Sequence, residues 1–173
     1  MACLLNNGVA FDCINNQAGV KEIYLFTFSA GTTYSTNAST NEITGATNMN
    51  NVYKFEFPHH TASYTDEAQI NQQNQSIAYT PTVSFKFNKM TAALRDKILL
   101  VARTRVCAMV TDNNGQYILL GQTNGLTASA AGGQTGVAAT DSNDYHLTLS
   151  GLESELGQFI TYGAFSAKIQ TTT

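Results

Sequence analysis

The sequence predicts a mainly β fold: a β-sandwich or partial barrel of about seven strands with one flanking α-helix. Several short segments are rich in β-branched and aromatic residues, which favours strands. One segment carries apolar residues at helical spacing, and an Asn-Gly turn joins two of the apolar segments as in a β-hairpin. A chain of 173 residues fits a single domain, residues 1–173, with a core of its own.

Three strands are predicted in the first half of the chain. Residues 21–28 (KEIYLFTF) are apolar on both faces, which is typical of a buried strand. Residues 52–57 (VYKFEF) alternate between aromatic and charged side chains, and Pro58 ends this strand. Residues 77–87 (IAYTPTVSFKF) alternate again. Pro81 predicts an edge position or a bulge there, because proline cannot donate to a strand ladder.

Three segments are predicted to be long exposed loops, at about residues 29–51, 58–76 and 123–143. The first is rich in Gly, Thr, Ser and Asn and leaves room for an irregular hairpin. The second contains almost no large apolar residue, and the third is rich in Gly, Ala and Thr. None of them has the apolar content to form a core of its own.

One helix is predicted over residues 91–103. Thr91 is a suitable N-cap, because its hydroxyl can accept a hydrogen bond from the first helical turn. Leu94, Ile98 and Val101 form an apolar stripe along one face, so we expect these three side chains to pack against the sheet.

The remaining strands follow the helix. Residues 105–111 (RVCAMVT) and 116–120 (QYILL) flank the turn at residues 112–115 (DNNG), whose Asn-Gly pair tolerates positive φ. Residues 145–149 (YHLTL) and 161–170 (TYGAFSAKIQ) supply the last two strands.

Composition favours a protein that assembles. Charged residues make up 12% of the chain, about half the usual share. In their place, 60 of the 173 residues are Thr, Asn, Ser or Gln. Such a surface stays hydrated but repels its own copies weakly. A stable secreted β-protein with the same composition is the alternative.

Several classes of protein are disfavoured. A net charge of −3 is unlike a general nucleic-acid binder, which needs a basic face. No run of about 18 apolar residues could span a membrane. The first residues show neither a cationic start nor the apolar core of a signal peptide, which predicts synthesis and retention in a cytoplasm.

No catalytic, cofactor or metal site is predicted, so the protein is not expected to be an enzyme. His59, His60 and His146 match no zinc or nucleophile motif. Gly132 and Gly133 read as loop glycines and precede no helix, so a phosphate site is not indicated.

Three cysteines are too few for a disulfide scaffold. Cys3 and Cys13 could pair under oxidising conditions. Alternatively, both of them and Cys107 are small buried hydrophobic residues.

Charge is unevenly ordered along the chain. Residues 86–105 contain one acid and six basic residues: Lys86, Lys89, Arg95, Lys97, Arg103 and Arg105. Residues 106–167 contain no Lys or Arg and five acids: Asp112, Asp141, Asp144, Glu153 and Glu155. A polar surface divided by chance would explain this order. The functional alternative is a subunit with a basic and an acidic part, whose copies pair unlike charges around a ring.

Residues 8–25 (GVAFDCINNQAGVKEIYL) resemble the start of tail-tube-like structural proteins from phages of the Bacteroidetes. In that family a short polar turn after a cysteine leads through Gly-Val-Lys into an Ile-Tyr strand. Ala18-Gly19 departs from the pattern, which has two glycines there. Three later segments occur in the family's order: residues 112–117 (DNNGQY), 121–126 (GQTNGL) and 143–153 (NDYHLTLSGLE). The resemblance covers most of the chain except residues 29–75.

This resemblance implies a structural virion protein. The family's members are small β-sandwiches with one flanking helix, and six copies form a ring whose inner strands join in a continuous barrel. Stacked rings form a hollow tube that conducts DNA during ejection. The implied partners are further copies in a homo-hexamer, and sheath, terminator or baseplate proteins. DNA is only transient in the lumen, no membrane is involved, and the implied location is the virion tail.

A lumen that conducts DNA should be acidic or neutral, because fixed cations would hold phosphate groups. We therefore expect the lumen-facing charges to come from the cation-free stretch, with four candidates: Asp141, Asp144, Glu153 and Glu155. The six basic residues of the stretch 86–105 are expected on the outer or intersubunit side.

Two other interpretations stay open. One is a secreted carbohydrate-binding or adhesin β-sandwich, in which Asn, Thr and Tyr side chains of the loops contact sugars; the absence of tryptophan argues against it. The other is a different virion component: a tail terminator, a baseplate hub or a capsid decoration protein.

Overall fold

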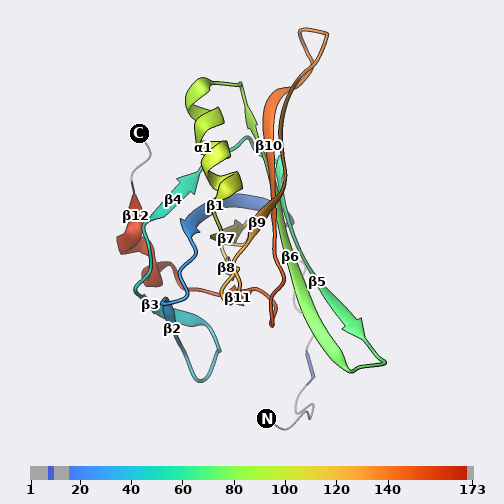
Figure 1. The fold of residues 1–173 in the computed structure, drawn as a ribbon. Coiled ribbons are helices and arrows are strands. Elements are labelled where there is room, and N and C mark those ends of the chain that lie inside the picture. The colour runs from blue at the N-terminus through green and yellow to red at the C-terminus, as the bar shows by residue number, and fades with distance from the viewer. Residues whose placement is uncertain (1–7, 10–15, 171–173) are drawn as a thin grey trace.

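The computed structural model describes residues 8–9 and 16–170, so Cys3 and Cys13, for which the sequence leaves both pairing and burial open, lie outside the described residues. The described chain forms twelve strands, one α-helix and two short 3-10 helices (Figure 1). The prediction of a mainly β fold with one α-helix is confirmed. The expected number of about seven strands is too low.

The first layer is a six-stranded sheet with the order β11-β8-β7-β1-β4-β12. Its centre is the antiparallel pair of β1 and β7, in which most side chains are buried. Both faces of the pair are covered, which accounts for the unbroken apolar runs in their sequences. The six strands are β1 (Val20–Thr27), β4 (Val52–Phe55), β7 (Val106–Asp112), β8 (Tyr117–Leu120), β11 (Gln158–Phe159) and β12 (Ile169–Gln170).

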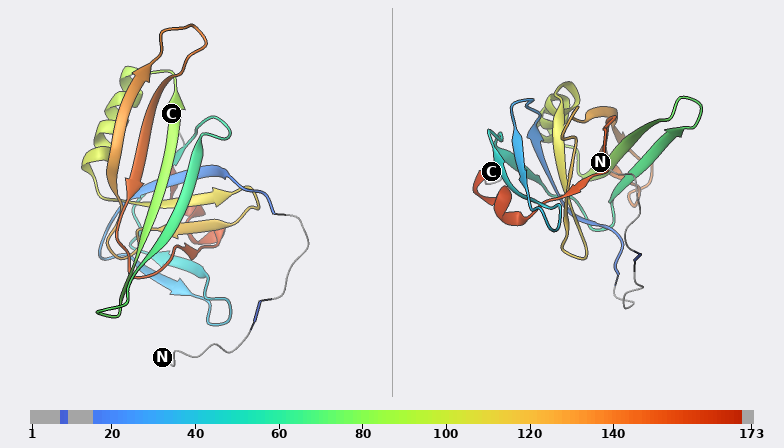
Figure 2. Two further views of the ribbon diagram at one scale, coloured as in Figure 1. Left: turned by 90° about the vertical axis from the view of Figure 1, so that its right-hand side faces the viewer. Right: turned by 90° about the horizontal axis from the view of Figure 1, so that it is seen from below.

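The second layer is a four-stranded antiparallel sheet with the order β5-β6-β10-β9. Its strands run across those of the six-stranded sheet (Figure 2). Alternate side chains of β6 and β10 point inward, and the others face away from the core. The four strands are β5 (Ala62–Asn71), β6 (Ser76–Asn88), β9 (Thr127–Thr135) and β10 (Asn143–Ser150).

The main core lies between the two sheets and the helix α1 (Ala92–Arg103). Phe85 of β6 and Leu147 of β10 are fully buried there. Ile98 and Val101 of α1 are also buried, and Leu94 packs half-buried against the same core, so the predicted apolar stripe is the face that the fold covers. The N–H of Leu94 donates to the Thr91 hydroxyl at 3.2 Å, which caps the helix.

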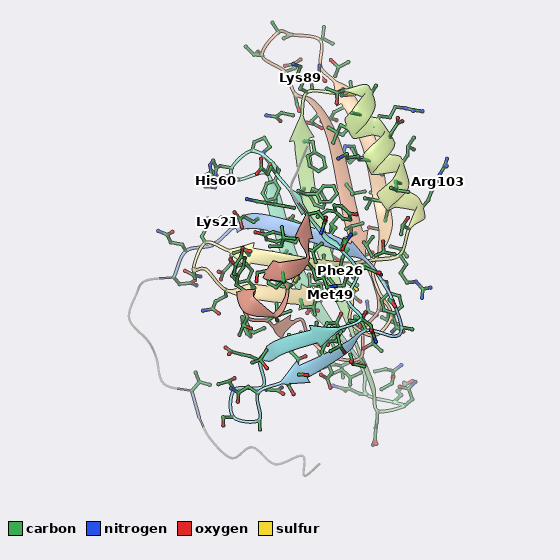
Figure 3. All side chains as sticks on the ribbon, turned by 90° about the vertical axis from the view of Figure 1, so that its left-hand side faces the viewer. Lys21, Phe26, Met49, His60, Lys89 and Arg103 are labelled. Carbon is green, nitrogen blue, oxygen red and sulfur yellow. The ribbon has the colours of Figure 1, made fainter. Side chains whose placement is uncertain are left out.

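A second hydrophobic core lies on the other face of the six-stranded sheet. It includes Phe26, Met49 and Cys107, and Figure 3 shows the first two side chains in the interior. Its cover consists of the hairpin β2 (Thr33–Thr36) and β3 (Ile43–Thr47), and of the 3-10 helices η1 (Tyr162–Ala164) and η2 (Ser166–Lys168). Phe165, between the 3-10 helices, is fully buried and meets the ring of Tyr24 edge-on at 5.6 Å.

Three sequence-based assignments are wrong. Residues 62–71 and 127–135 lie within predicted loops but form β5 and β9. Both are terminal strands made mostly of polar or small residues, with Tyr64 and Ile70 of β5 as the exceptions, so they lack the regular alternation that marks a half-buried strand. Residues 161–170, predicted as a strand, are mostly 3-10 helix. Within residues 29–51, the irregular hairpin is β2 and β3.

Pro81 lies on neither an edge strand nor a bulge, because β6 pairs with β5 on one side and β10 on the other. The Pro81 carbonyl accepts from Gly151 at 3.3 Å, so the backbone of Pro81 faces β10. The last pair within β10 is Ser150 and Thr82, and on the other side of Pro81 Tyr79 and Glu153 still exchange backbone hydrogen bonds at 2.9 and 2.8 Å. The missing N–H of Pro81 therefore interrupts this pairing at one position and does not end it.

The helix provides the first prediction. Ile98→Ala should lower the free energy of unfolding by about 2–4 kcal/mol, because it opens a cavity in the main core. Leu99→Ala is the matched control, since Leu99 is partly exposed and outside both cores, and it should unfold near the wild-type midpoint. Urea denaturation followed by circular dichroism measures both. Equal midpoints for the two variants would contradict the packing.

Candidate assembly surface

The four-stranded sheet has two edges with no partner strand among the described residues, one on β5 and one on β9. Gly136 donates to the Ser142 carbonyl at 3.0 Å across the β9–β10 hairpin. Along an antiparallel strand, the backbone N–H groups of successive residues point alternately toward the partner strand and away from it. Counting from Gly136, the N–H groups of Ala131, Gly133 and Thr135 point away from β10. No residue of β9 is charged, so its edge lacks the charge that commonly prevents pairing with another chain.

The outer face of this sheet is polar and almost uncharged. Ser84 and Thr148 lie opposite each other on β6 and β10, with their hydroxyls 3.2 Å apart. Along β5 and β6 the same face continues through four pairs: Ser63 with Ser84, Thr65 with Thr82, Gln69 with Ala78, and Asn71 with Ser76. Glu67 and Lys86 are the exposed carboxylate and ammonium on this face of β5 and β6.

The six basic residues do not share one surface. Lys86 points outward from β6, opposite His146 on β10. Arg95, Lys97 and Arg103 are exposed on α1, on the other side of the sheet. Figure 3 shows Arg103 pointing away from the helix into solvent, and Lys89 at the end of β6 before the helix. The exposed Arg105 holds its guanidinium carbon 5.7 Å from the centre of the Phe28 ring.

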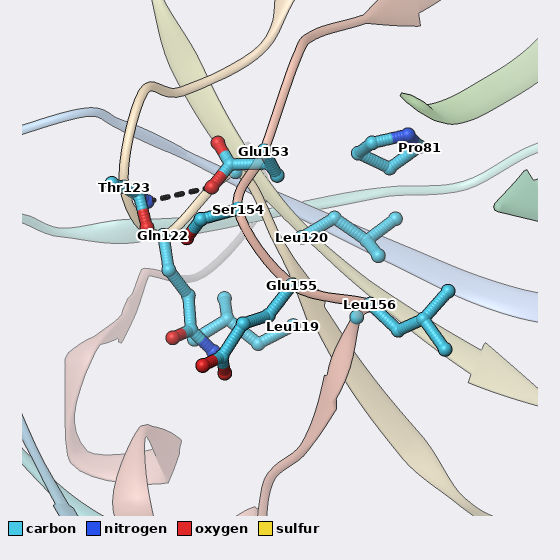
Figure 4. A pocket seen from close by; sticks show the side chains of 11 residues that line it. Pro81, Leu119, Leu120, Gln122, Thr123, Glu153, Ser154, Glu155 and Leu156 are labelled. Carbon is cyan, nitrogen blue, oxygen red and sulfur yellow. Dashed lines mark hydrogen bonds between the residues drawn. The ribbon is translucent and has the colours of Figure 1, made fainter. Parts of the chain in front are cut away.

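Glu153 is the most heavily bonded of the four candidate acids. Its carboxylate accepts hydrogen bonds from the N–H groups of Thr123, Asn124 and Gly125, at 2.9, 2.9 and 3.1 Å (Figure 4 draws the first). Gly125 has a φ of 75°, and a Cβ there would meet the Arg105 side chain at 2.6 Å. Glu153 is only 6% exposed, so its carboxylate fixes the loop after β8 and does not present a charge at the surface.

Asp144 is buried as well. Its carboxylate is 1% exposed and accepts a hydrogen bond from the Ser142 hydroxyl, which holds the pKa of Asp144 below its usual value. Glu153 and Asp144 are therefore poorly exposed, although Asp144 lies by register on the outer face of β10. Periodicity could not reveal this, because the contacts of Glu153 come from the loop at residues 123–125 and those of Asp144 from Ser142 and from Gln134 of the neighbouring strand.

Asp141 and Glu155 are the two exposed members of the set. Asp141 accepts from the N–H groups of Val137 and Ala138, both at 2.8 Å, and so shapes the β9–β10 turn. Glu155 lines a hollow of about 190 Å³ beside Glu153 (Figure 4). The other polar lining of that hollow is Gln122, Thr123 and Ser154, which supplies no base beside a nucleophile.

The Glu153 loop contact provides the second prediction. Glu153→Gln should lower the free energy of unfolding by roughly 2 kcal/mol, because a neutral amide replaces a carboxylate that accepts three buried or half-buried N–H bonds. Glu155→Gln removes the same charge from an exposed neighbour and should leave stability unchanged. Urea denaturation compares the two, and amide exchange at Thr123 to Gly125 should accelerate only in Glu153→Gln. Equal effects of both variants would contradict the assignment.

The three histidines lie on a loop and on β10, and the two glycines lie on β9. His59 and His60 are exposed on a loop, with ring centres 6.3 Å apart, and the described residues contain no cluster of three or more His, Cys, Asp or Glu able to bind a metal ion. Gly132 and Gly133 are strand residues of β9 and not loop glycines.

None of the described helices combines the length and hydrophobicity needed to cross a membrane. No protein-family model matches the chain, and the comparison with curated proteins gives no match.

Proposed function

We propose that this protein is a subunit of a phage tail tube, in which six copies close into a ring and stacked rings conduct DNA. The observation that most supports this proposal is the four-stranded sheet, which has a free edge on each side and a nearly uncharged outer face. Free edges associate readily with other strands, and closure of a ring leaves no edge open. The resemblance of the sequence to tail-tube-like proteins supports the same proposal.

The strand directions favour closure by rotation. Neighbouring strands in the order β5-β6-β10-β9 are all antiparallel, so β5 and β9 run in opposite directions. When copies are related by rotation about one axis, β9 of one subunit meets β5 of the next. The two edges are then antiparallel, and the ladder continues from copy to copy without a break in its pattern.

In this ring the outer face of the four-stranded sheet lines the channel. Its hydroxyl and amide side chains are hydrated but carry little charge to hold a phosphate backbone. The cations of α1 lie on the opposite side of the sheet, so in the proposed ring Arg95, Lys97 and Arg103 face away from the channel. Lys86 points from the face that lines the proposed channel, and the Asp144 carboxylate nearby offsets part of its charge.

Assembly tests the proposal. Negative-stain electron microscopy of the purified protein should show six-fold rings or tubes. Ala131→Pro should remain folded but stay monomeric, because proline removes an N–H that points from the free edge of β9 and leaves the ladder to β10 intact. Ala131→Val is the matched control, since it keeps the N–H and should assemble like the wild type. Sedimentation velocity measures the oligomeric state of all three.

Two outcomes would contradict the proposal. Monodisperse wild-type monomers at high concentration would exclude a self-assembling tube and favour the carbohydrate-binding alternative. Rings formed equally well by Ala131→Pro would show that β9 is not the joint between subunits.

A further inference from the structure

A wide apolar groove of about 550 Å³ lies between α1 and β4. Phe55 forms part of its floor, and Leu94 and Val101 of the helix form part of one wall. Leu100, on the rim, exposes 68% of its surface. Among the described residues nothing covers this rim, so the subunit leaves a large apolar side chain in water at the mouth of an apolar groove.

A second unpartnered apolar surface belongs to the hairpin of β5 and β6. Beyond Pro81 these strands pair with each other along the hairpin, and Tyr79 also forms a bridge with Glu153; this part, residues 67–80, is here called the arm. It projects roughly 17 Å from Pro81 to its tip, and Figure 2 shows it extending from the body of the subunit. Ile70 and Ile77 are directly opposite each other on the face that continues the core side of β6, and they are 66% and 50% exposed.

The two surfaces are complementary in position and charge. Figure 1 places the arm and α1 at opposite ends of the four-stranded sheet, so the arm of one copy meets the helix end of another when copies repeat in one direction along that sheet. The arm carries a single charged residue, Glu67, and no Lys or Arg. Helix α1 carries three cations and one acid. Association of these ends therefore brings unlike charges together.

We propose that the apolar face of the arm of one copy seats in the groove between α1 and β4 of a second copy. The contact is heterologous, because two different surfaces meet, and repetition along one direction gives an open stack. Under the proposed function this contact joins successive rings, whereas the edges of β5 and β9 close each ring. The stacking contact rests on the proposed function only for its place in a tube.

Paired variants separate stacking from ring closure. Ile70→Asp places a charge on the apolar face of the arm and should give rings that do not stack. Gln69→Asp adds the same charge on the opposite face and should give wild-type tubes. Leu100→Asp, on the groove rim, should reproduce the Ile70→Asp result. Electron microscopy scores rings and tubes, and thermal melting verifies that each variant folds.

Cross-linking tests the contact even if a charged variant fails to fold. Two separately purified proteins, one with Ile70→Cys and one with Leu100→Cys, are mixed and treated with a short bismaleimide. Cys3 and Cys13 are replaced by serine in both, and the native Cys107 is buried. Covalent dimers should be roughly tenfold more abundant than with Ser39→Cys in place of Ile70→Cys, because docking raises the effective concentration of the two thiols. Ser39 is an exposed control outside the arm.

The possible results are distinct. Six-fold rings without enriched cross-linking between positions 70 and 100 overturn the stacking contact and leave the ring proposal standing. Enriched cross-linking in a protein that forms no six-fold ring supports the contact and rejects the tube. Wild-type tubes from folded Ile70→Asp also overturn the contact. A wild type that does not assemble, together with no enriched cross-linking between the cysteine variants at positions 70 and 100, overturns both proposals.

Discussion

Burial of both faces of the six-stranded sheet is the constraint on which the rest of the structure depends. The central strands β1 and β7 alternate apolar side chains into two separate cores, so neither face tolerates water. The four-stranded sheet and α1 cover one face, and the β2–β3 hairpin with Phe165 covers the other. Each cover is amphipathic in turn: its inner side chains complete a core, and its outer face is free for other contacts.

The four-stranded sheet ends in long open edges, whereas the edge strands β11 and β12 of the six-stranded sheet have two residues each. A single antiparallel sheet that is not closed must end in two strands with free N–H and C=O groups. Here one end is β9, a strand of small and uncharged residues, and the other is β5, which extends into the arm. The stability of the single chain therefore depends on the cores, while the proposed association through strand edges depends on strands that contribute little to them.

The strongly apolar elements were predictable from the sequence, and the edges were not. Apolar runs or clear alternation reveal β1, β6, β7 and β8, and α1 follows from a capped apolar stripe. The polar strand β5 and the small-residue strand β9 are held by backbone hydrogen bonds, which leave no mark in the side-chain pattern. The burial of Asp144 and Glu153 was not predicted, for a related reason. The order of charges along the chain cannot show which side chains are buried, because burial depends on contacts between residues distant in sequence.

Cys107 has a consequence for chemical durability. Its thiol lies in the second core and donates to the Gly121 carbonyl at 3.0 Å, and burial raises the pKa of the thiol to about 12. Oxidants, disulfides and alkylating agents react with the thiolate, which is scarce at neutral pH when the pKa is so high. A change from a reducing to an oxidising compartment should therefore leave Cys107 unmodified while the chain stays folded, so that reaction of this thiol reports unfolding.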